Sequence, residues 1–213
     1  MGRAQQCLIV EDDYDGEFRY AGQPLAALYS FDSRERVLYL GTLNKAMFVT
    51  LRLAYLIVPR ELVEPLANIR TQMDGFTPAL TQMTMSLFMD EGHFASHLRR
   101  MRMLYAGKRT TLIEHLAPLA RYGWTWSNNP AGMHLMLRHA SGDYVRAVAV
   151  AANSLDLVLL SSYRHTEAED DGLFLRFGAL DVKTLQTGSA TLVAHCVAVH
   201  EATRRKSRKV KKG

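Results

Sequence analysis

The segment from residue 39 to residue 53 decides the fold of this chain, and it reads YLGTLNKAMFVTLRL. It begins with a short apolar strand, and a single lysine, Lys45, follows this strand after a brief polar stretch. Arg52 comes shortly after the lysine and opens a further predicted strand, which Pro59 closes. In α/β proteins such strands carry functional groups at their carboxyl ends or in the loops just beyond. The segment therefore predicts an α/β fold with a site near Lys45.

A dense polar cluster, EDDYD at residues 11–15, lies upstream of this segment. It follows the continuous apolar run from Cys7 to Val10, a pattern typical of a buried parallel strand that ends at a site. Asp12, Tyr14 and Lys45 therefore each lie at a strand end or in the loop beyond one. Because such ends meet at one edge of a sheet, we expect these three side chains to lie close together.

These residue types match the chemistry that a pyridoxal phosphate (PLP) site requires. The amine of Lys45 makes a Schiff base with the cofactor aldehyde, and burial beside other cations favours the neutral amine that attacks. Either Asp12 or Asp13 is the candidate carboxylate that keeps the ring nitrogen protonated. Tyr14 is the candidate hydrogen-bond partner of the ring phenolate oxygen. Taken singly, Lys45 fits a surface lysine and the acids fit a polar turn, but their joint spacing favours the PLP site.

The cofactor phosphate needs hydrogen-bond donors close to the lysine. Arg52 is the candidate for a bidentate contact, because its planar guanidinium matches two phosphate oxygens. Thr42 and Asn44 flank the lysine and add a hydroxyl and an amide. The candidate phosphate contacts are therefore Thr42, Asn44 and Arg52.

Composition places this site in a globular protein. The chain has 213 residues, of which 48% are hydrophobic, enough for a sizeable core. Cys7 and Cys196 lie far apart without metal-type spacing, which favours free thiols in a reducing compartment. The N-terminus lacks the apolar stretch of a signal peptide, and the apolar runs are too short to span a bilayer. We therefore expect a cytoplasmic location.

The end of the chain is strongly basic. Its last ten residues contain no acid and seven cationic residues, Arg204, Arg205, Lys206, Arg208, Lys209, Lys211 and Lys212. The net charge of the chain is +5, so the remainder carries −2 once these seven charges are set aside. Such a run often contacts phosphates, but a solvated and disordered terminus is the simpler interpretation.

Hydrophobic periodicity predicts the order of the elements. Helical patterns of period 3.6 lie at 62–69 and 80–88, and a long helix is expected from about residue 93 to 117. Shorter elements follow, with strands at 133–137, 157–161 and 173–177 and helices at 144–154 and 184–203. We expect one domain at 1–92, a connecting helix with a small C-terminal α/β domain at 93–203, and a basic disordered tail at 204–213.

Three motifs of the chain resemble those of the MocR-type regulators, in which a DNA-binding domain of the GntR family is fused to an aminotransferase domain of fold type I. EDDYDGEFRY at residues 11–20 is similar to the family motif EDDYDSEFRY, and residues 39–55 are similar to YLGTFSKTLFPGLRLGY. EGHFASHLRRMR at residues 91–102 is similar to EGHFARHLRRMR. Together the motifs are highly specific, and the resemblance covers nearly the whole chain up to about residue 190.

The resemblance implies a fold and a set of roles. The fold is the PLP-dependent transferase fold of type I, with 1–92 as the C-terminal part of the large, mostly parallel PLP-binding domain. Lys45 matches the Schiff-base lysine, Asp12 the partner of the pyridine nitrogen, and Tyr14 the phenolate ligand. Thr42 and Arg52 match phosphate contacts. Proteins of this fold type are homodimers whose partners complete one another's sites.

The chain also departs from the family pattern. Asn44 replaces the usual serine before the lysine, and residues 48–50 read FVT where the family has FPG. No stretch corresponds to the DNA-binding domain or to the early half of the large domain. We therefore expect a C-terminal fragment of a MocR-type protein, which would contact DNA only through a domain absent from this chain.

Two further groups of residues are candidates for binding. Arg176, on a late predicted strand, is the candidate for the carboxylate of an amino acid substrate or effector. Aminotransferases usually carry that arginine two residues earlier, at Phe174, but positions two apart share a strand face. His93 and His97 lie four apart on a helix close to Glu91, yet they lack the order of a zinc-binding helix motif. No metal site is expected.

Two functions remain open at this point. The first is a regulator whose aminotransferase-like domain senses PLP or an amino compound, and the second is a cytoplasmic PLP-dependent aminotransferase acting on an amino acid. The motifs favour the regulator, because the sequences at residues 11–20 and 91–102 are more typical of that family than of free-standing enzymes. The substrate, the effector and the operator do not follow from these residues.

Overall fold

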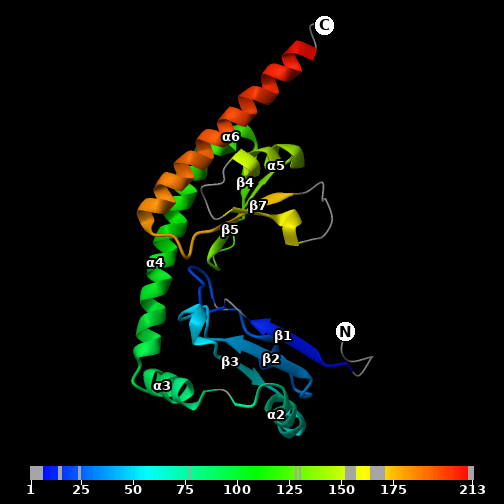
Figure 1. Cartoon of the computed structure of the whole chain (residues 1–213), viewed down its shortest axis with the longest axis vertical. Coiled ribbons are helices and arrows are strands. Elements are labelled where there is room, and N and C mark those ends of the chain that lie inside the picture. The colour runs from blue at the N-terminus through cyan, green and yellow to red at the C-terminus, as the bar shows by residue number, and fades with distance from the viewer. Residues whose placement is uncertain are drawn as a thin grey trace. The chain divides into compact units, whose positions relative to one another are not determined.

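The computed structural model describes residues 7–13, 16–23, 25–76, 78–127, 129, 131–151, 157–163 and 171–210. The chain forms two compact units that divide between Arg102 and Met103, within the long helix α4 (His93–Leu116) (Figure 1). The sequence predicts a domain boundary at residue 92, where this helix begins. The first turns of α4 belong to unit 1, and two of their side chains form hydrogen bonds to its loops.

Unit 1 contains a three-stranded sheet in the order β1–β2–β3. β1 (Ile9–Asp13) and β2 (Val37–Thr42) are parallel, whereas β3 (Ala54–Ile57) runs antiparallel to β2. Only residues 43–53 connect β2 to β3, which is too short for the crossover that a parallel neighbour requires. As a result, the ends of β1 and β2 and the start of β3 meet at one edge of the sheet.

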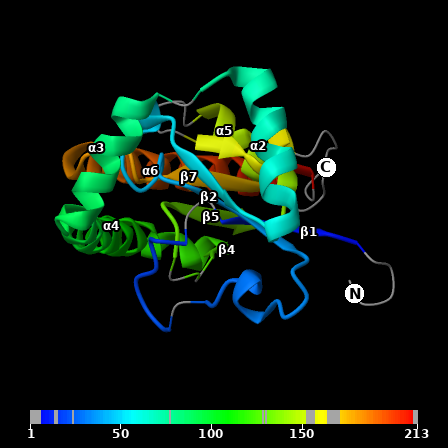
Figure 2. The same ribbon diagram turned by 90° about the horizontal axis from the view of Figure 1, so that it is seen from below.

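The remaining elements of unit 1 flank this sheet. They are the short 3-10 helices η1 (Leu28–Phe31) and η2 (Val49–Leu51) and the α-helices α2 (Arg60–Asp74) and α3 (Ala79–Asp90). Figure 2 shows α2 and α3 on one side of β2 and the segment that carries η1 on the other. The helices predicted at 62–69, 80–88 and from residue 93 are confirmed. Gly75 and Gly92 separate them with positive φ angles of 70° and 75°, which favour glycine.

Unit 2 contains a second sheet in the order β4–β5–β7–β6, and all three pairings are antiparallel. Its strands are β4 (Trp124–Trp126), β5 (His134–His139), β6 (Leu157–Leu159) and β7 (Gly172–Arg176). Its helices are η3 (Ala117–Tyr122), α5 (Gly142–Ala151), η4 (Leu160–Tyr163) and α6 (Val182–Val210). The strands expected at 133–137 and 173–177 and the helix expected at 184–203 are confirmed, and β4 is additional. The strand expected at 157–161 ends at Leu159, because residues 160 and 161 belong to η4. The helix expected at 144–154 is confirmed as far as Ala151, and residues 152–154 lie outside the described residues. Helix α6 continues beyond residue 203, into the segment for which the sequence predicts disorder.

The core of unit 2 lies between its sheet and its helices. Leu135 and Leu137 of β5 and Leu173 and Leu175 of β7 alternate along their strands and are almost fully buried. They pack with apolar side chains from α4, α5 and α6 in one continuous cluster. Within the part of the chain that the structure describes, no helix is both long and apolar enough to cross a membrane.

Candidate functional site

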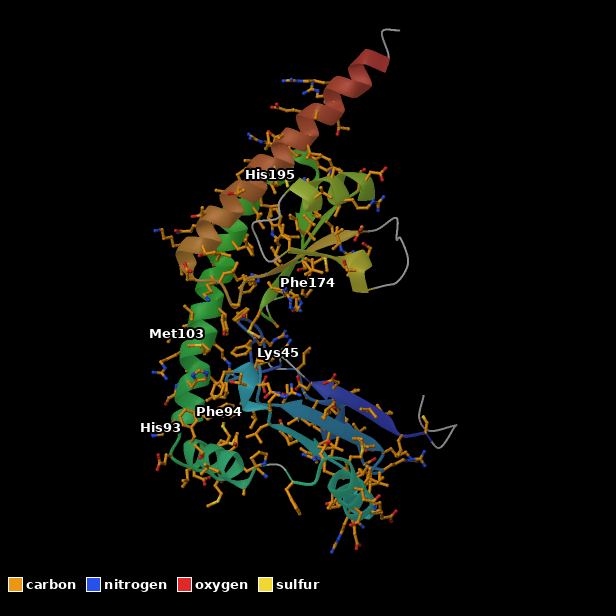
Figure 3. All side chains as sticks on the ribbon, in the orientation of Figure 1. Lys45, His93, Phe94, Met103, Phe174 and His195 are labelled. Atoms are coloured by element: carbon orange, nitrogen blue, oxygen red, sulfur yellow. The ribbon has the colours of Figure 1, made fainter. Side chains whose placement is uncertain are left out.

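The residues predicted to form the site come from three segments that meet at one edge of the unit 1 sheet. Asp12 lies near the end of β1 and pairs with Leu40, while Thr42 is the last residue of β2 and pairs with Ala54 of β3. Lys45 lies on the loop just beyond β2 (Figure 3), together with Asn44, and Arg52 lies just before β3. Tyr14 lies outside the described residues.

A network of hydrogen bonds closes the loop that carries Lys45. The Leu43 amide donates to the Leu53 carbonyl at 3.0 Å, and the Leu53 amide donates back to Oδ1 of Asn44 at 3.0 Å. The backbone amide of Asn44 donates to Oγ1 of Thr42 at 3.2 Å. Asn44, which replaces the serine of the family motif, therefore fastens the two ends of the loop to each other. Its side-chain NH₂ group is not used in these bonds and is the part suited to a phosphate oxygen.

Lys45 and its neighbour Ala46 have opposite environments. The Lys45 side chain is exposed, whereas Ala46 is buried to 1% exposure. The backbone is therefore anchored directly after the lysine, while the lysine side chain lies at the surface. A lysine whose main chain is held in this way suits the role of a nucleophile, because its direction is fixed.

Arg52 has a left-handed backbone conformation with φ 54° and ψ 36°. Non-glycine residues rarely adopt this region, and an observed outlier of this kind supports a functional hypothesis. The conformation turns the chain from η2 into β3, and Arg52 is exposed at this turn, seven residues after Lys45. A guanidinium at this position suits the binding of an anion.

The three acids at the end of β1 have different surroundings. Glu11 accepts hydrogen bonds from the amides of Leu28 and Tyr29 at 2.8 and 3.0 Å and so caps η1. Asp13 accepts one from the Tyr39 hydroxyl at 2.7 Å and one from the amide of Gly16 at 3.0 Å. Asp12 points to the opposite face of the strand and is exposed. Among the described residues no hydrogen bond reaches its carboxylate.

Two tyrosines and a glycine support the Asp13 side of the sheet. The rings of Tyr39 and Tyr55 lie 6.1 Å apart, and a side chain at Gly41 would come within 2.3 Å of the Tyr55 ring. Burial, together with the hydrogen bond to Asp13, raises the pKa of Tyr39 well above its usual value, so the phenol stays a donor. Sequence reasoning did not assign a role to Tyr39 or Tyr55. The glycine inside β2 was the available signal, because such a glycine often marks a close approach.

The family model for aminotransferase class I and II matches residues 3–166 of the chain. The chain belongs to this family. It is 32% identical over 209 residues to the probable rhizopine catabolism regulatory protein MocR of Rhizobium meliloti, a match that covers 95% of the chain and 41% of MocR. It is 28% identical over 183 residues to the pyridoxine biosynthesis regulator PdxR of Corynebacterium glutamicum, covering 86% of the chain and 40% of PdxR.

Solved structures establish the fold of this family member. The α-aminoadipate aminotransferase LysN of Thermus thermophilus, solved with N-(5'-phosphopyridoxyl)-L-leucine, superimposes with a TM-score of 0.80 at 22% identity. The match covers 93% of the chain and 52% of LysN. The chain therefore has the α/β aminotransferase fold of type I, as the sequence predicts, and spans about half the length of the proteins it matches or less.

Arg176 of this aminotransferase-family chain lies in unit 2, whereas Lys45 and the other candidate site residues of the described chain belong to unit 1. It ends β7, pairs with His134 and is exposed. Phe174 lies on the same face of β7 and stacks on His134 with the ring centroids 4.3 Å apart. Arg176 therefore shares a strand face with the position that carries the usual arginine.

The two histidines near the start of α4 serve separate contacts. Nε2 of His93 lies 3.1 Å from a carboxylate oxygen of Glu91, and the His93 ring lies 5.5 Å from that of Phe88. His97 instead lies against the carbonyl of Ala46, with its Nε2 atom 2.9 Å from the oxygen. No group of three or more potential metal ligands occurs among the described residues.

Proposed function

We propose that this chain binds PLP covalently through Lys45 and acts as the aminotransferase-like effector domain of a MocR-type, GntR-family transcriptional regulator. The observation that carries the proposal is the meeting of Asp12, Lys45 and Arg52 at one edge of the unit 1 sheet. An acid, an amine and a guanidinium from three segments are the groups that the cofactor's ring nitrogen, aldehyde and phosphate require.

The described residues fit the cofactor. The exposed Lys45 amine is the attachment point, and the Asp12 carboxylate is free of hydrogen bonds within the described residues and can pair with a protonated ring nitrogen. The Arg52 guanidinium, the Thr42 hydroxyl and the side-chain NH₂ group of Asn44 would hold the phosphate. When bound, PLP supplies an electron sink for bonds next to an amino group. Tyr14 is proposed as the partner of the ring oxygen on the resemblance alone.

The names of the relatives favour a regulatory role. MocR is named as a regulator of rhizopine catabolism and PdxR as a regulator of pyridoxine biosynthesis. We infer by similarity that an amino acid or amine, or PLP itself, is the effector, and that the regulator works as a cytoplasmic homodimer. DNA binding would belong to a helix-turn-helix domain outside these 213 residues.

Trapping the cofactor tests the proposal. The purified chain is incubated with PLP, reduced with borohydride and digested, and mass spectrometry locates the modified lysine. We expect the modification on the peptide containing Lys45, and none there in Lys45→Ala. Lys183→Ala, which removes a lysine in the first turn of α6, is the matched control and should trap PLP normally. Modification spread evenly over the lysines would contradict a specific site.

A cytoplasmic PLP-dependent aminotransferase is the second candidate function, favoured by the family and by Arg176. In this case Arg176 would bind the carboxylate of the amino acid through two parallel hydrogen bonds. Turnover of several amino donors with 2-oxoglutarate tests this function. Arg176→Gln should then raise KM more than it lowers kcat, because a binding contact is lost rather than a reacting group.

A further inference from the structure

The first turns of α4 make two hydrogen bonds to the loops that follow β1 and β2. Nε2 of His97 lies 2.9 Å from the carbonyl oxygen of Ala46, the residue directly after Lys45. Nε of Arg102 donates to the carbonyl oxygen of Glu17 at 2.6 Å, in the loop that follows Asp12 and Asp13. All of these residues belong to unit 1. One helix therefore holds both loops of the candidate site by their main chain.

We propose that His97 and Arg102 are positioning residues, which fix the loop of Lys45 and the loop of the acids relative to each other. The proposal rests on the proposed function of this site. Neither residue is assigned a contact with the cofactor or with a reacting atom. Their role is to keep the amine and the carboxylate at a constant separation, which a cofactor that must meet both requires.

The His97 contact cannot easily be replaced by water. Ala46 is buried, so removal of the imidazole would leave a buried carbonyl without this hydrogen bond. A carbonyl only accepts, and hence Nε2 of His97 must carry the hydrogen.

The Arg102 contact acts on the other loop. Glu17 directly follows Gly16, whose amide donates to Asp13, and precedes Phe18, which is fully buried. The short segment is thus held by Asp13 from within β1 and by Arg102 from α4. Because the donor is a guanidinium, its bond to the Glu17 carbonyl is charge-assisted.

Hydrogen exchange of the chain without cofactor tests the two contacts separately. His97→Leu should speed amide exchange in residues 43–51 about five- to tenfold and leave residues 134–139 of unit 2 unchanged. Arg102→Leu should speed exchange in residues 16–20 instead. His93→Leu and Arg99→Leu are the matched controls, since both change exposed side chains of the same helix. Equal exchange in His97→Leu and His93→Leu at residues 43–51 would overturn the proposal.

A conservative variant separates positioning from general stability. His97→Gln keeps an N–H donor near the position of Nε2, so it should restore slow exchange in residues 43–51 and the trapping of PLP on Lys45. Failure of His97→Gln to restore either property, in a chain whose unit 2 exchange is normal, would contradict a positioning role. If the unaltered chain traps no PLP at all, the proposed function fails. The exchange pattern still decides whether the two contacts hold the loops.

Discussion

Asp12 and Asp13 are neighbours in sequence, but their carboxylates have different hydrogen-bond partners and different exposure. Asp13 is bound by Tyr39 and Gly16, whereas Asp12 faces the other side of β1 and is exposed. Asp12→Asn should therefore lower PLP trapping on Lys45 strongly with little change in stability. Asp13→Asn should trap PLP better than Asp12→Asn and lower the free energy of unfolding by about 1–3 kcal/mol, through its weakened bond to Tyr39. Borohydride trapping and urea unfolding measure both effects, and the reverse ranking in trapping would show that the strand register is misassigned.

The two cysteines should differ sharply in reactivity. Burial raises the pKa of Cys196 to about 12, so its thiolate is scarce at any ordinary pH, whereas Cys7 is exposed. At pH 8 a disulfide reagent such as Ellman's should titrate one thiol in the folded chain and two after denaturation. Cys7→Ser should abolish the fast reaction. Fast reaction of both thiols in the native chain would mean that the core around Cys196 opens readily.

Residues that follow a strand could be placed from the sequence, because strand ends meet at one sheet edge. Asp12, Thr42 and Lys45 are of this kind, Arg52 lies just before the next strand, and the structure brings these segments together. The bond from His97 to Ala46 could not be derived in this way. It joins residues 51 positions apart through a side chain whose direction depends on how α4 packs. Periodicity places a residue on an element but does not say which loop that element touches.

At the scale of single elements, Asp171 ties η4 to the start of β7. Its buried carboxylate accepts hydrogen bonds from the amide and hydroxyl of Ser161 at 3.0 and 2.8 Å, and from the Gly172 amide at 2.9 Å. Burial alone would raise the pKa of Asp171, but these bonds and the charge of Arg146 bring the pKa below its usual value. The ionised carboxylate therefore stabilises the folded state.

This linkage predicts how the stability of unit 2 varies with pH. Because the folded pKa of Asp171 lies below the unfolded one, its contribution is present above the unfolded pKa and is lost as pH falls through the folded pKa. Asp171→Asn should lower the free energy of unfolding by about 1–3 kcal/mol at pH 7, and by progressively less as pH falls below the unfolded pKa, toward pH 3. Urea unfolding at both pH values measures the difference. Asp143→Asn, an exposed acid of α5, is the control and should show little effect at either pH.

The elements themselves followed from the sequence where they were long or strongly periodic. Helices α2, α3 and α4 agree with their period of 3.6, whereas β4 was missed because three residues are too short to show alternation. The basic residues after position 203 favoured disorder, yet α6 continues to Val210. Lysine and arginine have high helix propensity, which net charge alone does not reveal.

At the scale of the whole molecule, the two units bury apolar surface very unequally. Unit 2 has a continuous core, whereas β1 and β3 are the outer strands of the described sheet in unit 1, and β3 is exposed along its whole length. Large apolar side chains are also exposed on this sheet and on the segments around it, among them Val10, Leu25, Phe31, Leu56, Phe76 and Leu80. A surface of this kind favours association with another polypeptide.

We therefore expect the isolated chain to associate and to show little or no transaminase turnover. Size-exclusion chromatography with light scattering should detect oligomers or aggregates rather than a single monomer. Leu56→Lys, which charges an outer strand, should reduce association, whereas Val150→Lys on α5 of unit 2 should not. A monodisperse monomer with rapid turnover of amino donors against 2-oxoglutarate would contradict this expectation.

The unequal burial of the two units also has a consequence during synthesis on the ribosome. A ribosome releases unit 1 before unit 2, so the segments with the least buried surface leave the exit tunnel first. Until another polypeptide covers them, these segments are targets for general chaperones, which bind exposed apolar stretches. Unit 2 can close its core once α6 has been synthesised. The yield of usable protein in a cell should therefore follow chaperone capacity during translation more closely than the thermodynamic stability of unit 2.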